Sequence, residues 1–449
     1  MNQRTGFAAV LWSSCLAMLA VGANSTAIMA ALPSMRSELA LSAAGVEWAV
    51  NAYLVVSAAF IVLGGQAADR FGARPASMAG LALFAVASCI IAAAGTQAEL
   101  LAGRALQGLA AAIAVPSTLA AVDTSATSER RAAAIGAWTG FLMLGFSIGP
   151  LLGGAFTHFT GWRVIFWFNV ALMLGAMAGL ACARAAAARA SSGESRRADW
   201  LGFVLLITLM VSLVFALHAL PQARAAPLSV IGPFALAAAA FVLLLVVEAR
   251  VKPPFVDLTF FARRKFAMGV AIGSLAMFSI ISLLLYFNLY AQSRDGLGLS
   301  ALEAGAVLLP LSAALLALAL SAPAVAARLG LRHAKTGGMA LIAIASATIG
   351  AAVIAGGEMT LLTIGFLLMG AGLAVPYALA PRLALSALAP AQAGQGSGMI
   401  NACTFLAGSF GVAGGGTALA LGGFPAVLMM IALAGIAGAA LSHFMSETA

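Results

Sequence analysis

A short stretch of the chain, GGQAADRFGARP, concentrates charge and glycine in a sequence of which only 8% is charged. Gly72 permits the sharp backbone turn that a short loop between two helices requires. Asp69 can accept hydrogen bonds from N–H groups at a helix start and from an arginine of a neighbouring segment, with Arg130 and Arg131 as candidates. Such a stretch can act as a latch between helix ends; the alternative is that its arginines only orient the chain in a membrane. The candidate latch residues are Gly65, Asp69, Arg70, Gly72, Arg74 and Arg131.

Arg104, a second candidate for chemistry, lies inside an apolar run. It is about five residues from the end of the run, which is roughly 7 Å at 1.5 Å per residue. Its long side chain either reaches the nearer membrane surface or places a charge inside the membrane that faces the substrate cavity, and intramembrane charges are functional by default. Gln107, next to Gly108, lies nearly one helical turn further along, so it shares the face of Arg104.

Polar and aromatic residues inside the other apolar runs are candidates for lining a substrate cavity. Each is costly in lipid, so we expect each to face the protein interior or the headgroup region. For each of them, the alternative is a hydrogen bond or ring contact that only stabilises packing. The candidates are Asn24, Thr26, Asn51, Tyr53, Trp138, Asn169, Tyr286, Asn288, Tyr290, Tyr377 and Asn401.

Other kinds of site have no support in the sequence. The four histidines fall at the ends of apolar runs or between them, without the spacing of metal ligands. No phosphate-binding loop, Ser/His/Asp set or paired-carboxylate site is present. We therefore predict no metal, no cofactor and no enzymatic activity.

The composition indicates that the solvent of this chain is lipid. Of its 449 residues 63% are hydrophobic and 48 are glycine, which is far more apolar than a water-soluble domain of this length. Apolar runs of roughly 18 to 25 residues recur throughout, each long enough to cross a bilayer. We predict an all-α polytopic membrane protein with fourteen transmembrane helices. The predicted spans are 7–30, 46–67, 76–95, 99–121, 133–156, 164–183, 201–219, 228–248, 266–291, 304–326, 336–355, 360–380, 397–419 and 424–443.

The distribution of basic residues orients these spans. With both termini in the cytoplasm, the inner segments hold 18 basic residues and the outer loops hold only four, Arg36, Arg163, Arg224 and Arg294. Because lysine and arginine favour the cytoplasmic side, we predict a multi-pass protein of the inner membrane with both termini in the cytoplasm. Topology thus accounts for the net charge of +9, and we expect no nucleic-acid partner.

The opening stretch occurs twice. Residues 67–88 align without a gap on 325–346, and both segments contain Arg-x-Gly-x-Arg. One copy joins spans two and three and the other joins spans ten and eleven, which indicates two related six-helix halves with an extra helix pair between them. Parallel repeats of this kind place the substrate path at the interface of the halves. The predicted parts are an N-terminal half at 1–185, a cytoplasmic linker at 186–200, a two-helix insertion at 201–250, a cytoplasmic connector at 251–265 and a C-terminal half at 266–449.

These motifs resemble those of the major facilitator superfamily over almost the whole chain. The frame G-x-x-x-D-R-x-G-x-R resembles the signature loop of the family, and RALQG resembles its fourth-helix motif. The segments NSTAIMAALP, WAVNAYLV and GWRVIFWFN resemble the branch of fourteen-span drug:proton antiporters. The segment GAWTGFLMLGFSIGPLLGG resembles the fifth-helix motif of drug antiporters. The residues of that last motif are Gly136, Gly145, Gly149, Pro150, Gly153 and Gly154.

The resemblance implies the major facilitator fold and a mechanism in which two six-helix halves rock around a central site. It implies proton-coupled export of lipophilic small molecules by a monomer, with the loop latch stabilising the outward-facing state. In the fifth helix, small residues let neighbouring backbones approach, and Pro150 bends the helix. That segment is then a tight seal between the halves, although helix packing alone also explains its glycines.

One departure from the family pattern concerns the proton. Relatives in the fourteen-span branch usually carry an aspartate where this chain has Asn24, which cannot titrate, and Glu47 at the outer mouth of the second span is the best substitute. The expected partners are a lipophilic substrate, protons and the lipid bilayer. Two alternatives stay open: a dedicated exporter or importer of one metabolite, and a membrane sensor or scaffold that transports nothing.

Overall fold

The computed structural model describes residues 3–183, 200–220, 226–250, 257–389 and 392–444. Over these ranges the chain is helical and forms no strand, which confirms the predicted all-helical class. The α-helices are α1 (Gln3–Glu38), α2 (Ala43–Phe71), α3 (Ala73–Ala93), α4 (Gln97–Ser125), α5 (Ser128–Phe159), α6 (Arg163–Cys182), α7 (Trp200–Ala219), α8 (Leu228–Arg250), α9 (Arg264–Gln292), α10 (Ala301–Val307), α11 (Leu309–Leu329), α12 (Leu331–Ile354), α13 (Met359–Leu385) and α14 (Ala393–Phe444), and a 3-10 helix covers Leu258–Ala262.

Twelve helices within the described ranges are long and apolar enough to cross a membrane. Helices α10 and α11 are bent by 41° across Leu308, and this pair makes a thirteenth candidate if it is one span. Helix α14 contains non-helical backbone at Gly422 and Gly423, where the sequence predicts that one span ends and the next begins. The structure thus gives twelve or thirteen candidate spans, and a count of fourteen stays a prediction.

The helices extend beyond the predicted spans. Helix α1 continues past residue 30, so Arg36 lies in its last turn and not in a loop. Lys335 is one of the 18 basic residues counted for the inner segments between spans, but it lies inside α12 and is 1% exposed, so its placement between spans is wrong. Hydropathy marks the part of a helix that crosses the lipid, whereas the hydrogen-bonded turns continue beyond it.

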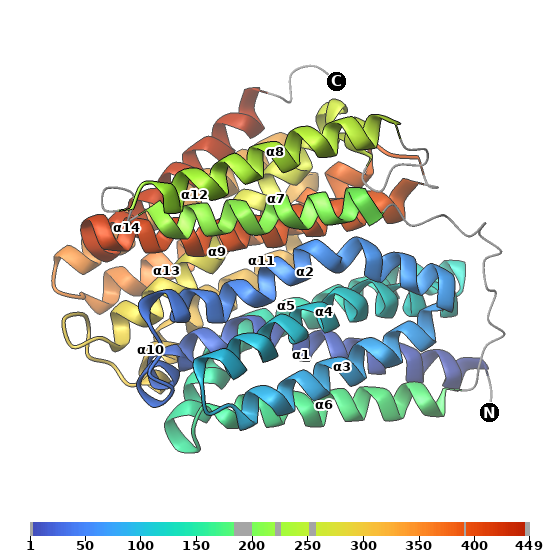
Figure 1. Ribbon diagram of the computed structural model, residues 1–449, viewed down its shortest axis with the longest axis horizontal. Helices are drawn as coiled ribbons and strands as arrows, with labels where there is room; N and C mark the ends of the chain where they lie inside the picture. Colours follow the sequence, from blue (N-terminus) through green and yellow to red (C-terminus); the bar gives the residue numbers. More distant parts are fainter. Residues whose placement is uncertain (1–2, 184–199, 221–225, 251–256, 390–391, 445–449) are drawn as a thin grey trace. The chain divides into compact units, whose positions relative to one another are not determined.

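The chain forms two compact units. The first contains Met1–Ser195 and Ala291–Ser312, and the second contains Arg196–Tyr290 and Ala313–Ala449. In the first unit α1 to α6 run side by side, from blue to green in Figure 1, and α10 contacts α5. In the second unit α7 contacts α8 and α14, and α12 contacts α13 and α14. The predicted linker lies outside the described residues except for Trp200, and so do residues 251–256 of the predicted connector.

Close backbone contact between α1 and α5 organises the first unit. A Cβ atom on Gly22 would collide with the carbonyl of Leu142, and one on Gly145 would collide with the carbonyl of Leu19. In lipid, helix association depends on such close approach because little hydrophobic driving force remains between helices. The contact holds the polar residues of α1, including Asn24, in the interior of the unit.

Candidate functional site

Arg104 of α4 is a fully buried cation. Its Nε donates a hydrogen bond of 2.7 Å to the carbonyl of Ala49 in α2, and its Nη1 donates one to Oε1 of Gln107. The guanidinium carbon lies 4.6 Å from the ring centroid of Tyr53, within the range of a cation–π contact. Arg104 is therefore buried in the first unit and does not reach its surface, and that it faces a substrate cavity stays a prediction.

Gln107 connects Arg104 to three further helices. Its Oε1 also accepts from Nδ2 of Asn24 at 3.2 Å, and its Nε2 donates to Oγ of Ser88 at 3.0 Å. Oδ1 of Asn24 in turn accepts from Nδ2 of Asn169 at 2.8 Å. All of these side chains are buried. The resulting Arg104 network, which consists of Asn24, Ser88, Arg104, Gln107 and Asn169, joins α1, α3, α4 and α6.

The Arg104 network contains a charge without a carboxylate. The guanidinium of Arg104 donates to a backbone carbonyl and to a carboxamide, whereas Arg131 pairs with Asp123 and Arg163 pairs with Glu38. Burying a guanidinium against neutral acceptors costs free energy, because only uncharged dipoles replace its hydration. All five side chains of the network are buried, so it holds one positive charge among amide and hydroxyl dipoles in the interior of the first unit.

The fifth-helix motif meets the same core. Pro150 has no N–H, so the carbonyl of Phe146 one turn earlier loses its helical donor. The hydroxyl of Thr26 replaces that donor at 3.1 Å. A Cβ atom on Gly149 would collide with this same hydroxyl. A Cβ atom on Gly153, the next glycine of the motif, would collide with the carbonyl of Ala27.

The other glycines of this motif differ in their surroundings. A Cβ atom on Gly154 would collide with the carbonyl of Ala301 in α10, and one on Gly305 would lie 2.6 Å from the carbonyl of Pro150. Helix α10 therefore rests on the glycine-rich face of α5. A Cβ atom on Gly136 would have no neighbour within 4 Å, so no close contact in the first unit requires glycine at this position.

The loop stretch turns at Gly72, which ends α2 and begins α3 with φ of +91°. A side chain is strained at this angle, as expected from the sequence. Nη2 of Arg74 donates to the carbonyl of Ala181 in α6 at 2.9 Å. Asp69 and Arg70 are exposed, and Arg131 lies 3.0 Å from Asp123.

The second copy of the loop has the same geometry. Gly330 ends α11 and begins α12 with φ of +79°. Arg332 corresponds to Arg74, and its Nη2 lies 3.3 Å from the imidazole of His443 at the end of α14. In each unit the arginine after the turning glycine thus contacts the last helix of its half.

The repeat extends from the loops into the cores. In the gapless register Ile91 of α3 corresponds to Ile349 of α12. A Cβ atom on Gly103 would lie 2.5 Å from Cγ1 of Ile91, and one on Gly365 would lie 2.5 Å from Cγ1 of Ile349. Helices α4 and α13 are therefore equivalent with Gly103 matching Gly365. The next residue in each helix is Arg104 in the first unit and Phe366 in the second.

Phe366 is part of an aromatic cluster. Its ring centroid lies 4.8 Å from that of Phe287, which lies 6.2 Å from that of Phe424. The ring of Tyr290 stacks on Phe424 at 4.9 Å. In the second unit, aromatic rings thus occupy the region that corresponds to the Arg104 network of the first unit.

Several of the remaining cavity candidates bond partners outside the network. In the second unit, Nδ2 of Asn288 donates to the carbonyl of Leu284 at 2.8 Å, Nδ2 of Asn401 donates to that of Ser397 at 2.9 Å, and the Tyr286 hydroxyl donates to that of Val412. In the first unit, Nε1 of Trp138 donates to Oγ1 of Thr118 at 3.2 Å. Three further candidates are placed as follows: Asn51 is buried, and Glu47 and Tyr377 are half-buried.

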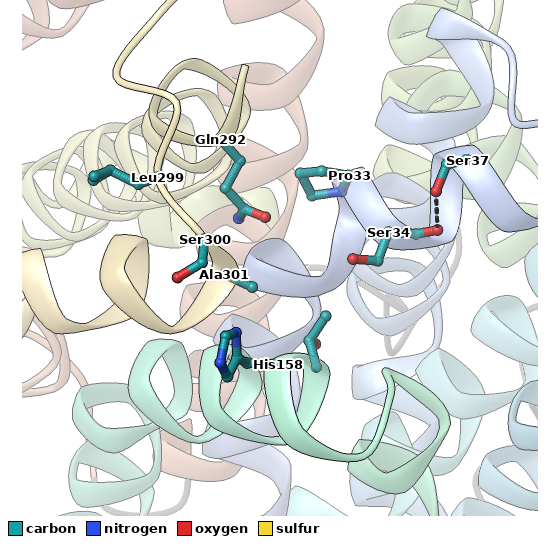
Figure 2. Close-up of a pocket in the computed structure, with 9 residues that line it drawn as sticks. Pro33, Ser34, Ser37, His158, Gln292, Leu299, Ser300 and Ala301 are labelled. Carbon is teal, nitrogen blue, oxygen red and sulfur yellow. Dashed lines mark hydrogen bonds between the residues drawn. The ribbon is translucent and has the colours of Figure 1, made fainter. Parts of the chain in front are cut away.

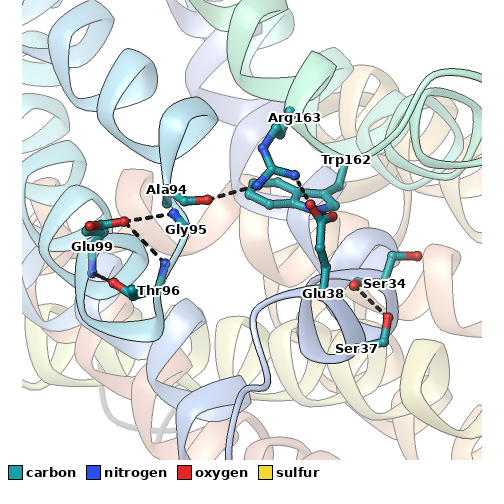
Figure 3. Close-up of polar contacts among 9 residues, drawn as sticks. All are labelled: Ser34, Ser37, Glu38, Ala94, Gly95, Thr96, Glu99, Trp162 and Arg163. Atoms are coloured by element: carbon teal, nitrogen blue, oxygen red, sulfur yellow. Dashed lines mark hydrogen bonds and ion pairs between the residues drawn. The ribbon is translucent and has the colours of Figure 1, made fainter.

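The sequence did not indicate every member of these sites. Ser88 is one serine among several in apolar runs, and the carbonyl of Ala49 has no sequence signal. The sequence analysis also missed a cluster of Glu38, Trp162 and Arg163 (Figure 3), although a glutamate and an arginine beside a tryptophan are a usable signal. Nε1 of Trp162 donates to Oε2 of Glu38 at 2.6 Å, and Nη2 of Arg163 donates to the carbonyl of Ala94 at 2.9 Å. This cluster fastens the ends of α1 and α3 to the start of α6.

The sequence matches a large family and several of its members. Residues 14–412 match the Major Facilitator Superfamily. The chain is 31% identical to the tetracenomycin C resistance and export protein of Streptomyces glaucescens over 90% of this chain and 74% of that protein. It is 32% identical to the cephamycin export protein CmcT of Amycolatopsis lactamdurans over 89% of this chain and 82% of that protein. It is also 32% identical to the methylenomycin A resistance protein of Bacillus subtilis (strain 168), where the match covers 67% of this chain and 64% of that protein.

A solved structure shares the fold. The crystal structure of the human organic anion transporter MFSD10 (TETRAN) superposes with a TM-score of 0.66 over 98% of this chain and 100% of that chain, at 18% sequence identity. Together with the family match over most of the chain and the apolar helices, this places the molecule among multi-pass membrane transporters of small molecules. The resemblance seen in the sequence motifs is confirmed, and the chain belongs to the major facilitator superfamily.

Proposed function

We propose that this protein is a secondary active transporter that exports lipophilic small molecules across the inner membrane in exchange for protons. The observation that carries the proposal is the Arg104 network, because a fully buried guanidinium with neutral acceptors is costly and serves no purpose in a passive scaffold. The export and resistance functions named for the relatives support the direction of transport.

The proposed topology has fourteen spans with both termini in the cytoplasm. Its support is the bent pair α10 and α11, taken as one span, and the break at Gly422 and Gly423, taken as a turn between two spans. Two six-helix halves at 1–185 and 266–449 then alternate access around a central site, and the pair α7 and α8 at 201–250 is an insertion. The halves rock as units, and the protein works as a monomer.

The gating residues are proposed on their positions in this topology. Gly72 and Arg74 hold the inner loop of the first half against α6, and Asp69 of the same loop latches the outward-facing state. The glycine-rich face of α5 seals the outer side where α10 rests on it. Gln107 positions Arg104 at the substrate, and Glu47 supplies the outer titratable group for the proton.

The proposed substrates are neutral, zwitterionic or weakly acidic lipophiles. A cation in a low-dielectric cavity needs an opposing charge, and Asn24 supplies only an amide beside the charge of Arg104. Cation–π contacts at about 0.5–2 kcal/mol do not replace a buried carboxylate for a divalent cation. An acidic group, in contrast, can form an ion pair with the guanidinium of Arg104.

Transport in proteoliposomes with and without an imposed pH gradient tests the proposal. A matched set of neutral, acidic, monovalent cationic and divalent cationic lipophiles should show gradient-dependent movement of the first two classes and poor movement of the divalent cations. Asn24→Asp should improve divalent cation export, because it replaces a neutral amide of the network by a negative charge. Efficient divalent export by the unmodified protein contradicts the substrate class.

The same experiment separates the alternatives. Movement of one compound and none of its analogues would indicate a dedicated carrier of a single metabolite. Absence of movement for the whole set, with normal reconstitution, would favour a sensor or scaffold and would contradict the export function.

A further inference from the structure

A basic surface of the second unit has no part in the proposed transport function. The hollow in Figure 2 is different, because Ala301 lines it and also meets Gly154 at the proposed outer seal. The basic surface lies where the 3-10 helix at Leu258–Ala262 leads directly into α9. Three consecutive basic residues occupy this point, and all of them are exposed. They are Arg263, Arg264 and Lys265, and together they form the basic junction.

Arg263 fastens the basic junction to the segment that follows α13. Its Nη1 donates to the carbonyl of Ala387 at 2.7 Å and to Oε1 of Gln392 at 3.3 Å. Its guanidinium carbon lies 5.6 Å from the ring centroid of Phe260, which is fully buried. The two residues that follow Arg263 are thereby held at a fixed place on the surface. A ligand that binds them does not have to order this segment, which lowers the entropic cost of binding.

An exposed aromatic ring lies beside these charges. Phe261 meets the fully buried Phe266 edge-on, with 5.4 Å between the ring centroids. Phe266 is already part of α9, an apolar helix long enough to cross a membrane. Basic and aromatic side chains next to the start of a span are typical of the headgroup region of a bilayer.

A buried charge lies close to the basic junction. Lys335 of α12 is 1% exposed, and its Nζ lies 3.9 Å from Sδ of Met268, one turn after Arg264 in α9. A thioether is a weak acceptor without charge. Because Lys335 is buried, it does not touch a ligand at the surface, but its charge is screened less than an exposed one and raises the positive potential there.

Membrane topology alone does not explain the position of Lys265. Basic residues in the last turns of α2, α8, α11 and α13 orient the chain and also suit the helix dipole. Lys265 lies in the first turn of α9, where the dipole disfavours a cation. Two other basic residues in first turns meet an oxygen, since Arg74 donates to the carbonyl of Ala181 and Arg131 pairs with Asp123. An anionic ligand would do the same for Lys265.

We propose that the basic junction binds the phosphate of an anionic phospholipid such as phosphatidylglycerol. Arg264 and Lys265 contact the phosphate oxygens, and Phe261 contacts the glycerol and the first carbons of the acyl chains. Basic clusters at the cytoplasmic end of a span recognise anionic headgroups in this way, and the proposed topology places the start of α9 in the cytoplasm. The bound lipid ties the connector before α9 to the membrane surface.

Native mass spectrometry of the full-length protein in a non-ionic detergent tests this site without any transport. The probes are phosphatidylglycerol and phosphatidylcholine with the same acyl chains, and glycerol 3-phosphate as a soluble headgroup. Phosphatidylglycerol should bind about 30-fold more tightly than phosphatidylcholine, as expected for two basic residues beside an anionic headgroup. Glycerol 3-phosphate should not displace it, because the soluble compound lacks the acyl chains that Phe261 contacts.

Paired substitutions locate the binding. Arg264→Gln combined with Lys265→Gln should remove most of the preference for phosphatidylglycerol. Arg70→Gln combined with Arg130→Gln removes the same charge from exposed residues of the first unit, each of which follows a carboxylate residue in the sequence, and should leave the preference unchanged.

Three results would overturn the proposal. The first is equal binding of the two lipids by the unmodified protein, and the second is an equal loss of preference in both double variants. The third is displacement of the lipid by glycerol 3-phosphate, which would assign the basic junction to a soluble phosphate. None of these results depends on whether the protein exports anything.

Discussion

The two units of this transporter have different residues at equivalent positions of their interiors. In the first, Arg104 follows a glycine that lies against Ile91, and Gln107 joins it to amides on two other helices. In the second, Phe366 follows the equivalent glycine and packs on Phe287.

A serine lies three residues before Ile91 in α3 of the first unit and three residues before Ile349 in α12 of the second. Ser88 and its counterpart Ser346 each donate to their own helix at 2.8 Å. In the first unit Ser88 also accepts from Gln107, whereas Met369, fully buried, stands at the position of Gln107 in the second. Because the fold accepts apolar residues at these positions, the buried charge of the first unit is not a requirement of folding, and we infer that function retains it.

The largest effect is expected when the first unit is made to resemble the second at this position. Arg104→Met should lower export about 100-fold, since hydrogen bonds to a charged group contribute up to about 3 kcal/mol. Thermal stability should stay equal or rise, because replacing a buried charge by an apolar side chain is often neutral or stabilising. Export measured in proteoliposomes checks the first effect, and thermal unfolding of the purified protein checks the second. Loss of stability together with loss of export would mean that the charge is structural.

The opposite behaviour is expected at the equivalent position of the second unit. Phe366→Ala should lower the stability of the folded state by about 3–5 kcal/mol, the usual cost of removing a buried aromatic ring. Phe366→Leu retains part of the volume and serves as the milder control. Thermal unfolding measures the loss, and a stability equal to that of the unmodified protein would show that the aromatic cluster does not contribute to the packing of the second unit.

The two turning glycines should respond alike. Gly72→Ala and Gly330→Ala each place a side chain at a positive φ, which costs about 1–2 kcal/mol. Because the two loops have the same conformation, the loss of stability should be equal within the error of thermal unfolding, and Gly136→Ala on α5 is the control without a strained angle. If only one of the two substitutions lowers the stability, the two loops do not contribute equally to it despite their equal conformation.

The smallest effect concerns the starts of α4 and α13. Thr96 and Glu99 form a capping box at the first, whereas Glu358 alone caps the second with its carboxylate. The N–H of Leu361, followed by the hydroxyl and N–H of Thr360, holds the pKa of Glu358 below its usual value. The contribution of this cap to stability is therefore present above the unfolded pKa of about 4.3 and is lost as pH falls through the lower folded value.

Amide exchange at the start of α13 detects this cap. Glu358→Ala should speed exchange at residues 360 and 361 and leave the start of α4 unchanged. If exchange at α13 is the same with and without Glu358, the cap adds no local stability.

The sequence predicted the elements better than their contacts. The positions of the apolar runs follow from hydropathy, which is a local property, and the turn at Gly72 follows from the conformational freedom of glycine. The duplication of the loop placed the equivalent turn at Gly330. Each of these signals lies within a few consecutive residues.

What the sequence did not predict depends on residues far apart in the chain. Nothing in the sequence of α3 marks Ser88 as the partner of Gln107, and a backbone carbonyl such as that of Ala49 leaves no trace in composition. The bend across Leu308 is equally absent from the hydropathy, because both sides of it are apolar. Lys335 looked like one more loop charge because its burial arises from neighbouring helices.

Helix α14 has a consequence for the way the protein is made. Residues 393–444 contain no lysine, arginine, aspartate or glutamate, and the backbone breaks only at Gly422 and Gly423. In the proposed fourteen-span topology, the insertion machinery meets two consecutive spans with no charged residue between them to signal a boundary. The orientation of the pair therefore depends on basic residues outside it, of which Arg382 at the end of α13 precedes it, and the two glycines set the point at which the chain turns back.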